Sequence, residues 1–110
     1  MINDEYLGCV DKLLSLAKKI EDEKRPAYTN NSTDVLHNFK SNAVKIGINS
    51  RQAWANMWLK HVDAISSWAA NPSTPQAEEL EGRFADLINY TKLGYAIYCE
   101  EHTVKHSDRR

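Results

Sequence analysis

The sequence predicts an all-α fold, organised as a four-helix bundle-like single domain, and three observations favour it. Hydrophobic residues recur at spacings of three and four along four separate stretches, which is typical of amphipathic helices. The segments between these stretches contain proline and small polar residues, which favour turns. The 110 residues are 42% hydrophobic and 26% charged, an ordinary globular composition. We therefore expect one helical domain over residues 1–101 and a fraying polar tail over residues 102–110.

The first helix is expected over residues 2–23. Its apolar stripe is formed by residues at spacings of three and four, namely Tyr6, Leu7, Val10, Leu13, Leu14, Ala17 and Ile20. Residues 24–32 contain Pro26 and a cluster of small polar side chains, so we expect a loop there. A second helix should begin near Ser32 to Asp34, whose side-chain oxygens suit an N-cap. It should end at Gly47, which adopts a left-handed C-terminal conformation at little steric cost.

The third helix is expected from a cap at Asn49 or Ser50 to Ala70, because this stretch has the most regular apolar period in the chain. The period is formed by Trp54, Met57, Trp58, His61, Val62, Ile65, Trp68 and Ala69. An Asn-Pro pair at positions 71–72 should end the helix, because proline cannot continue it.

The fourth helix is expected to begin at Ser73 or Thr74, just before Pro75, and to reach about Glu101. Its apolar residues occupy more than one face. Such a helix suits the centre of a bundle or an interface between subunits. A domain this small has little concave surface and often builds a pocket between copies, so we expect a homo-oligomer.

Net charge and composition argue against several functional classes of protein. A formal net charge of -1 gives no general attraction to phosphate backbones, which argues against sequence-independent nucleic-acid binding as the main role. Asp4 and Glu5 stand where a secretory signal carries positive charge, and no apolar run approaches the roughly 18 residues that span a bilayer. Cys9 and Cys99 fit free thiols of a reducing compartment. We therefore expect a cytoplasmic protein without a membrane partner.

Asp86 is an informative polar residue because apolar residues flank it on both sides, where an unpaired carboxylate would be costly. In a functional interpretation, Asp86 joins Glu79 or Glu81 in holding Mg²⁺ or in accepting hydrogen bonds from a polar ligand. In a structural interpretation, these carboxylates pair with Arg83 or Lys60. The sequence leaves both open. We expect no cofactor, with Mg²⁺ as the alternative, and assign no catalytic residue.

The parts of a nucleotide site occur close together in the first half of the chain. Arg25 supplies a guanidinium for phosphate, and Tyr28 supplies a ring for stacking. Asp34 and Asn38 supply groups for base edges or ribose hydroxyls. Equally, Asp34 can cap its helix and Asn38 can face water. This cluster predicts a nucleotide or cyclic nucleotide as the small-molecule partner.

His61 lies on the apolar, tryptophan-rich stripe of the third helix, with Lys60 beside it. His61 is either a group that binds a ligand or acts as a base, or a core histidine whose hydrogen bonds are satisfied. The second case is the commoner one. Lys60 is either a phosphate partner or an exposed lysine that solvates the helix.

Three segments together resemble a known family: residues 34–40, residues 60–65 and residues 81–90. They are similar to the small phage-encoded helical proteins of the nucleotide modification associated domain type 1 family, over residues 25–98. The resemblance implies a virus-encoded protein that works on or with nucleotides, and a location in the host cytoplasm. The matching polar positions are Asp34, Asn38, Lys60, His61, Asp86, Asn89 and Tyr90.

That family invites comparison with the all-α nucleoside triphosphate pyrophosphatases, in which carboxylates on two helices hold Mg²⁺ through an ExxE and a later ExxD pattern. Residues 78–81 satisfy the first pattern, but Arg83 stands three positions before Asp86, where the second requires glutamate. Three functions follow. We favour a non-catalytic binding protein that sequesters a nucleotide-derived host defence signal. The alternatives are an Mg²⁺-dependent nucleotide pyrophosphatase or nucleotide-modification enzyme, and a protein–protein adaptor.

Overall fold

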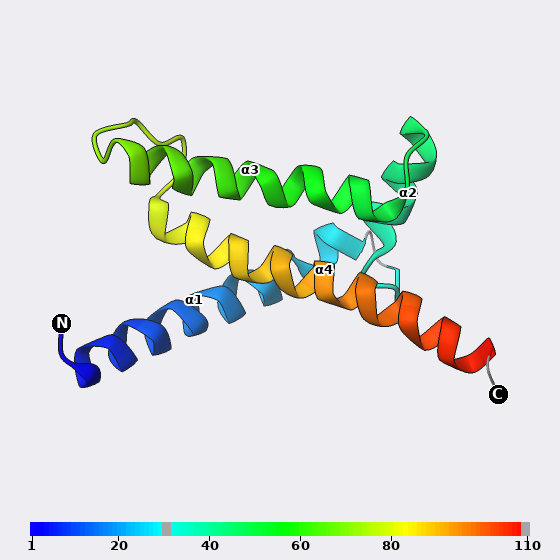
Figure 1. Cartoon of the computed structure of the whole chain (residues 1–110), viewed down its shortest axis with the longest axis horizontal. Coiled ribbons are helices and arrows are strands. Elements are labelled where there is room, and N and C mark those ends of the chain that lie inside the picture. The colour runs from blue at the N-terminus through cyan, green and yellow to red at the C-terminus, as the bar shows by residue number, and fades with distance from the viewer. Residues whose placement is uncertain (30–31, 109–110) are drawn as a thin grey trace.

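The computed structural model describes residues 1–29 and 32–108, without the side chains of Tyr28 and residues 104–108. It contains four helices, α1 (Asn3–Thr29), α2 (His37–Ile46), α3 (Ser50–Ala70) and α4 (Leu80–Asp108). No strand occurs within this described part, so the prediction of an all-α fold is confirmed. The long helix α4 lies between α1 and α3, and the short helix α2 packs near the ends of α1 and α3 (Figure 1). None of these helices is both long and apolar enough to cross a membrane.

The arrangement is bundle-like but open. Its radius of gyration is 16.5 Å and its extents are 50 × 32 × 26 Å, whereas a compact chain of this length has a radius of about 13 Å. The N-terminal half of α1 and the C-terminal end of α4 project from opposite sides of the molecule (Figure 1). Each therefore exposes more surface than a closed four-helix bundle would.

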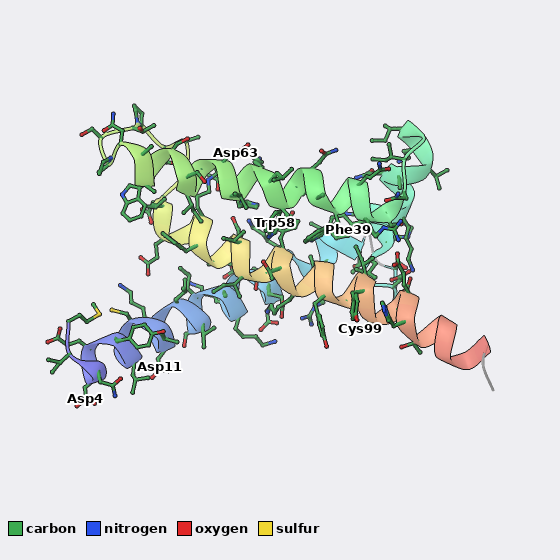
Figure 2. The ribbon with its side chains drawn as sticks, in the orientation of Figure 1. Asp4, Asp11, Phe39, Trp58, Asp63 and Cys99 are labelled. Atoms are coloured by element: carbon green, nitrogen blue, oxygen red, sulfur yellow. The ribbon has the colours of Figure 1, made fainter. Side chains whose placement is uncertain are left out.

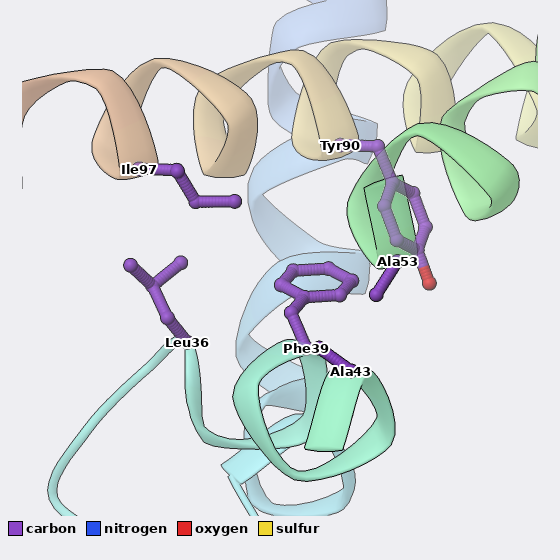
Figure 3. Close-up of a cluster of buried hydrophobic side chains, with 6 residues drawn as sticks. All are labelled: Leu36, Phe39, Ala43, Ala53, Tyr90 and Ile97. Carbon is purple, nitrogen blue, oxygen red and sulfur yellow. The ribbon is translucent and has the colours of Figure 1, made fainter. Parts of the chain in front are cut away.

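The main hydrophobic core lies where α2, α3 and α4 meet. Its buried members are Leu36, Phe39, Ala43, Ala53, Tyr90 and Ile97 (Figure 3). Leu36 and Ile97 point toward one another, and the rings of Phe39 and Tyr90 meet edge to face with centroids 6.2 Å apart. These contacts anchor the short helix α2, which is below the length that is stable alone in water.

Two tryptophans of α3 bind α4 through both polar and apolar contacts. Trp54 Nε1 donates to the carbonyl oxygen of Tyr90 at 2.6 Å, and Trp58 Nε1 donates to Thr91 Oγ1 at 3.1 Å. The two indoles stack with centroids 5.6 Å apart. Gly94 faces the Trp54 ring, and the missing side chain allows α4 to approach it closely.

Helix α1 is longer than predicted, because it continues through Pro26 to Thr29 instead of ending near residue 23. Pro26 cannot donate to the carbonyl of Asp22, but it lies in the last turn, and two side chains bind other carbonyls at this end of the helix. Thr29 Oγ1 donates to the carbonyl of Arg25 at 3.1 Å, and Asn38 Nδ2 donates to that of Ala27 at 2.8 Å. The predicted loop over residues 24–32 is therefore wrong up to Thr29, while residues 30–31 lie outside the described part.

The end of α2 and the whole of α3 agree with the sequence. Gly47 ends α2 in the left-handed conformation, with φ of 73°. Asn49 caps α3 in a reciprocal box, in which its side chain accepts from the backbone of Gln52 and the Gln52 side chain accepts from that of Asn49. The start of α2 was predicted too early. Asp34 accepts from the backbone N–H of Leu36, so it forms a turn before the helix instead of capping it.

Helix α4 begins and ends later than predicted. Residues 71–79 form a loop that bonds back to α3, where Gln76 Nε2 donates to the carbonyl of Ala64 and Thr74 Oγ1 to that of Ser67. These tertiary bonds compete with a helix start at Ser73 or Thr74. The residues expected to fray after Glu101 continue α4 to Asp108, and Arg109 and Arg110 lie outside the described part.

Candidate functional site

Helix α4 places three polar side chains in the protein interior at a spacing of three residues. Arg83, Asp86 and Asn89 are 7%, 4% and 2% exposed, and we term them the α4 polar row. Each has a buried atom without a hydrogen-bond partner in the described part of the chain: Arg83 Nε, Asp86 Oδ1 and Asn89 Oδ1. Leaving such a group unsatisfied costs about 1–3 kcal/mol. Natural proteins contain few of them, and the exceptions often mark a functional site or a bound water.

Asp86 is held by a cationic side chain of α1 and lies beside a histidine of α3. Lys24 Nζ on α1 lies 3.6 Å from Asp86 Oδ1, and His61 Nδ1 on α3 lies 3.9 Å from Asp86 Oδ2. The prediction that this carboxylate needs a partner is confirmed, but its cationic partner is Lys24 instead of Arg83 or Lys60. Because Lys24 is half-exposed, its ammonium can remain hydrated while it compensates the buried charge.

His61 is a buried core histidine that touches the α4 polar row. Burial lowers the pKa of His61 below its usual value of 6.5, although the nearby Asp86 carboxylate acts in the opposite direction. Arg83 Nη1 lies 3.4 Å from His61 Nδ1. A guanidinium can only donate, so Nδ1 is the acceptor and the neutral imidazole carries its proton on Nε2. The ring stacks on Tyr90 with centroids 5.0 Å apart.

Three hollows share lining residues, and we term them together the amide groove; the first of them touches this row at Asn89. The first, of about 170 Å³, is lined by Glu21, Arg25, Thr29, Val35, Asn89 and Leu93. The second, of about 200 Å³, is lined by Val35, Asn38, Phe39, Asn42, Met57 and Tyr90. The third, of about 250 Å³, is lined by Asn42, Lys45, Ile46, Ala53, Asn56 and Met57. Val35 borders the first two and Asn42 borders the last two, so the groove runs from α1 across α2 to α3.

The groove brings together several of the residues predicted from the sequence. Arg25 and Asn89 line the first hollow, and Asn38 and Tyr90 line the second. His61 joins them through its stack on Tyr90. The side chain of Tyr28 lies outside the described part of the chain.

Besides His61, three predicted residues with described side chains line none of the three hollows: Asp86, which is buried beside Lys24, and Asp34 and Lys60. Asp34 accepts from Lys40 at 2.6 Å, and Lys40 also bonds Glu100. The Lys40 ammonium and the Leu36 amide lower the pKa of Asp34, and the two carboxylates raise the pKa of Lys40. Lys60 is exposed on α3. Asp34 thus acts in a structural ion pair.

The sequence did not identify three groups that the structure adds. Asn42 lies one turn after Asn38 on α2, a spacing of four that could have suggested a shared face. Lys24 and Asn56 had no such signal, because only the packing of the helices brings them to Asp86 and to the third hollow.

The carboxylates considered as an alternative magnesium site do not converge. Glu81 pairs with Lys12 at 3.6 Å, Asp86 is buried beside Lys24, and Glu79 precedes the first turn of α4. Among the side chains that the structure describes, no three histidines, cysteines or acids are placed to hold a metal ion together.

Comparison of the chain with protein-family models, with curated proteins and with solved structures finds no match. The resemblance to the nucleotide modification associated domain type 1 family therefore stays a prediction, as does a phage origin.

Proposed function

We propose that this protein binds a nucleotide or nucleotide-derived signal in the amide groove without converting it. The observation that carries the proposal is the lining of the groove, in which asparagines from α2, α3 and α4 stand between Arg25 at one end and Lys45 at the other. Amides both donate and accept, as base edges and ribose hydroxyls require, and the two cations suit phosphate. In a phage, such a protein would sequester a host defence messenger.

Two of the amides have a defined orientation. Asn89 Nδ2 donates to the carbonyl of Ala17 at 2.8 Å, and Asn38 Nδ2 donates to that of Ala27 at 2.8 Å. Each side chain therefore keeps its Oδ1 as an acceptor. Amino groups of nucleobases and ribose hydroxyls are donors that match the Asn38 oxygen, whereas the Asn89 oxygen is buried beneath the first hollow.

The size and apolar surface of the groove also fit a nucleotide. Binding pockets for small molecules usually measure about 300–1,000 Å³, and each hollow is smaller than that, so a nucleotide would extend over two of them. Val35 and Met57, which are 45% and 39% exposed, lie at the junctions between hollows. Their apolar surfaces suit the face of a base.

Binding without turnover is supported by the way the nearby carboxylates are engaged. Glu21, at the edge of the first hollow, accepts from Arg25 at 3.2 Å and pairs with Lys92 at 2.6 Å. Asp34, Glu81 and Asp86 are each likewise paired with a lysine, whereas phosphoanhydride hydrolysis of the kind considered from the sequence needs carboxylates free to clamp Mg²⁺.

Calorimetric titration with nucleotides, deoxynucleotides and cyclic oligonucleotides, with and without Mg²⁺, tests the proposal. We expect one class of ligand to bind and to be recovered intact by chromatography. Mg²⁺-dependent conversion would instead establish an enzyme. If no ligand of the panel binds, the proposal is overturned and a protein–protein adaptor is favoured.

The variant Arg25→Gln tests whether the ligand binds at the first hollow. Loss of a charge-assisted hydrogen bond of about 1.5–3 kcal/mol should weaken binding by roughly tenfold or more. Lys19→Gln is the matched control, because it removes the same charge from an exposed position of α1 that does not line the groove. Equal affinity of the two variants would place the ligand elsewhere.

A further inference from the structure

The first turns of α1 carry apolar side chains that the rest of the described chain does not cover. Tyr6, Leu7 and Leu14 are 56%, 49% and 51% exposed, whereas Ala17, further along the same stripe, is 2% exposed. The change has a geometric cause. Helix α4 begins at Leu80, and its first turn meets α1 at Lys12, whose ammonium pairs with Glu81. Before this point α1 extends past the start of α4 into open space (Figure 1).

A helix that projects in this way needs a partner to be stable. Isolated helices shorter than about 12–15 residues are marginal in water, and the stability of helices in proteins comes mainly from burial of an apolar face. The apolar stripe of α1 continues into the projecting segment, with Val10 and Leu13 only partly covered. The open radius of 16.5 Å is consistent with a surface that packs against another molecule.

The charges on this segment indicate what that molecule is. Asp4 and Glu5 lie at the start of α1, and Lys18 and Lys19 lie further along the same helix, where Lys18 also pairs with Asp22 at 2.9 Å. Figure 2 shows Asp4 and Asp11 along the projecting part of α1. Two copies of the segment in antiparallel orientation, centred near Asp11, would set Asp4 of each copy beside Lys18 of the other. The two Asp11 side chains would meet at the centre of this pair, whereas a parallel arrangement would place every charge of the segment beside its own like, which is less favourable.

We propose that residues 3–18 of α1 form a self-association surface, on which a second copy of this chain packs its own α1 in antiparallel orientation. The apolar side chains of Leu7, Val10 and Leu14 then become buried between the copies, as in an antiparallel coiled coil. This proposal does not depend on the amide groove, so either can fail without the other.

Light scattering coupled to gel filtration at micromolar concentration tests the surface. The unchanged chain should have the mass of a dimer, and the double variant Leu7→Asp/Leu14→Asp should have that of a monomer. Val44→Asp is the control, because Val44 is an apolar residue of α2 that is 83% exposed and lies outside the segment. This control should remain a dimer. A monomeric unchanged chain, or a dimeric Leu7→Asp/Leu14→Asp variant, would overturn the proposal.

A charge exchange tests the orientation by a measurement that does not require loss of the apolar side chains. Asp4→Lys should weaken the dimer at low salt, since it places two lysines together across each end of the pair. Adding Lys18→Asp to the same chain should restore the affinity, because each lysine then faces an aspartate. A double variant that dimerises no more tightly than Asp4→Lys alone would refute the antiparallel arrangement.

Discussion

Substitution of Gly94 by alanine tests the close contact that sets α3 against α4. An added Cβ would lie 2.5 Å from Trp54 Cε2 and 2.8 Å from Trp54 Cη2, with Cζ2 closer still. The indole cannot easily retreat. Its Nε1 donates to the carbonyl of Tyr90 at 2.6 Å, and its face stacks on Trp58. Either the two helices must separate or the ring must give up these contacts.

The expected cost follows from opposing terms. Alanine is better than glycine in a helix interior by about 1 kcal/mol. Overpacking a well-filled core costs about 1–3 kcal/mol, and the lost hydrogen bond and aromatic stack each cost about 1 kcal/mol. Overpacking and the lost contacts outweigh the gain in helix propensity, and we expect Gly94→Ala to lower the free energy of unfolding by about 2–4 kcal/mol. For a domain of this size, that is a fall of roughly 8–16 °C in Tm.

Thermal unfolding followed by circular dichroism measures the effect, and the chain supplies two controls. Gly82 on the same helix and Gly8 on α1 have nothing within 4 Å of an added Cβ. Gly82→Ala and Gly8→Ala should therefore be neutral or stabilising by up to about 1 kcal/mol. If Gly94→Ala proves as stable as Gly82→Ala, the close packing of Trp54 on α4 is refuted.

Three further substitutions test single interactions. His61 has a lowered pKa, so the unfolded chain takes up the proton first and stability should fall as the pH drops below about 6.5. The free energy of unfolding, measured in urea across this pH range, should depend less on pH in His61→Gln than in the unchanged chain. Equal pH dependence of the two proteins would contradict this. Asp86→Asn should lower the free energy of unfolding by about 1–3 kcal/mol, because it removes the carboxylate that Lys24 faces, and an unchanged Tm would argue against that contact. Asn49→Ala should cost about 1 kcal/mol through loss of the capping box, whereas Ser50→Ala should change the Tm little; the reverse order would assign the cap to Ser50.

Local chemistry explains the features that could be predicted from the sequence. Gly47 ends α2 because glycine enters the left-handed conformation without steric cost, and Asn49 begins α3 because its side chain binds a backbone N–H of the first turn. The need of Asp86 for a partner was also visible, since its apolar neighbours imply burial. These effects depend on residues within one or two turns of each other, so they can be predicted from the sequence alone.

The residues that meet at the candidate site could be identified only from the tertiary structure. Arg25 meets Asn89, and Lys24 meets Asp86, only because α1 packs against α4. The same packing corrected the helix bounds, since Asn38 of α2 supports the last turn of α1 beyond its proline.

The sequence by itself therefore determined the helical class, the end of α2, the start of α3 and the burial of Asp86. Only the tertiary structure decided which polar groups meet, where α1 and α4 end, and which apolar surface of α1 stays exposed. The physical reason is that periodicity and capping act along the chain, whereas the partner of a buried charge or an apolar stripe depends on the relative position of whole helices.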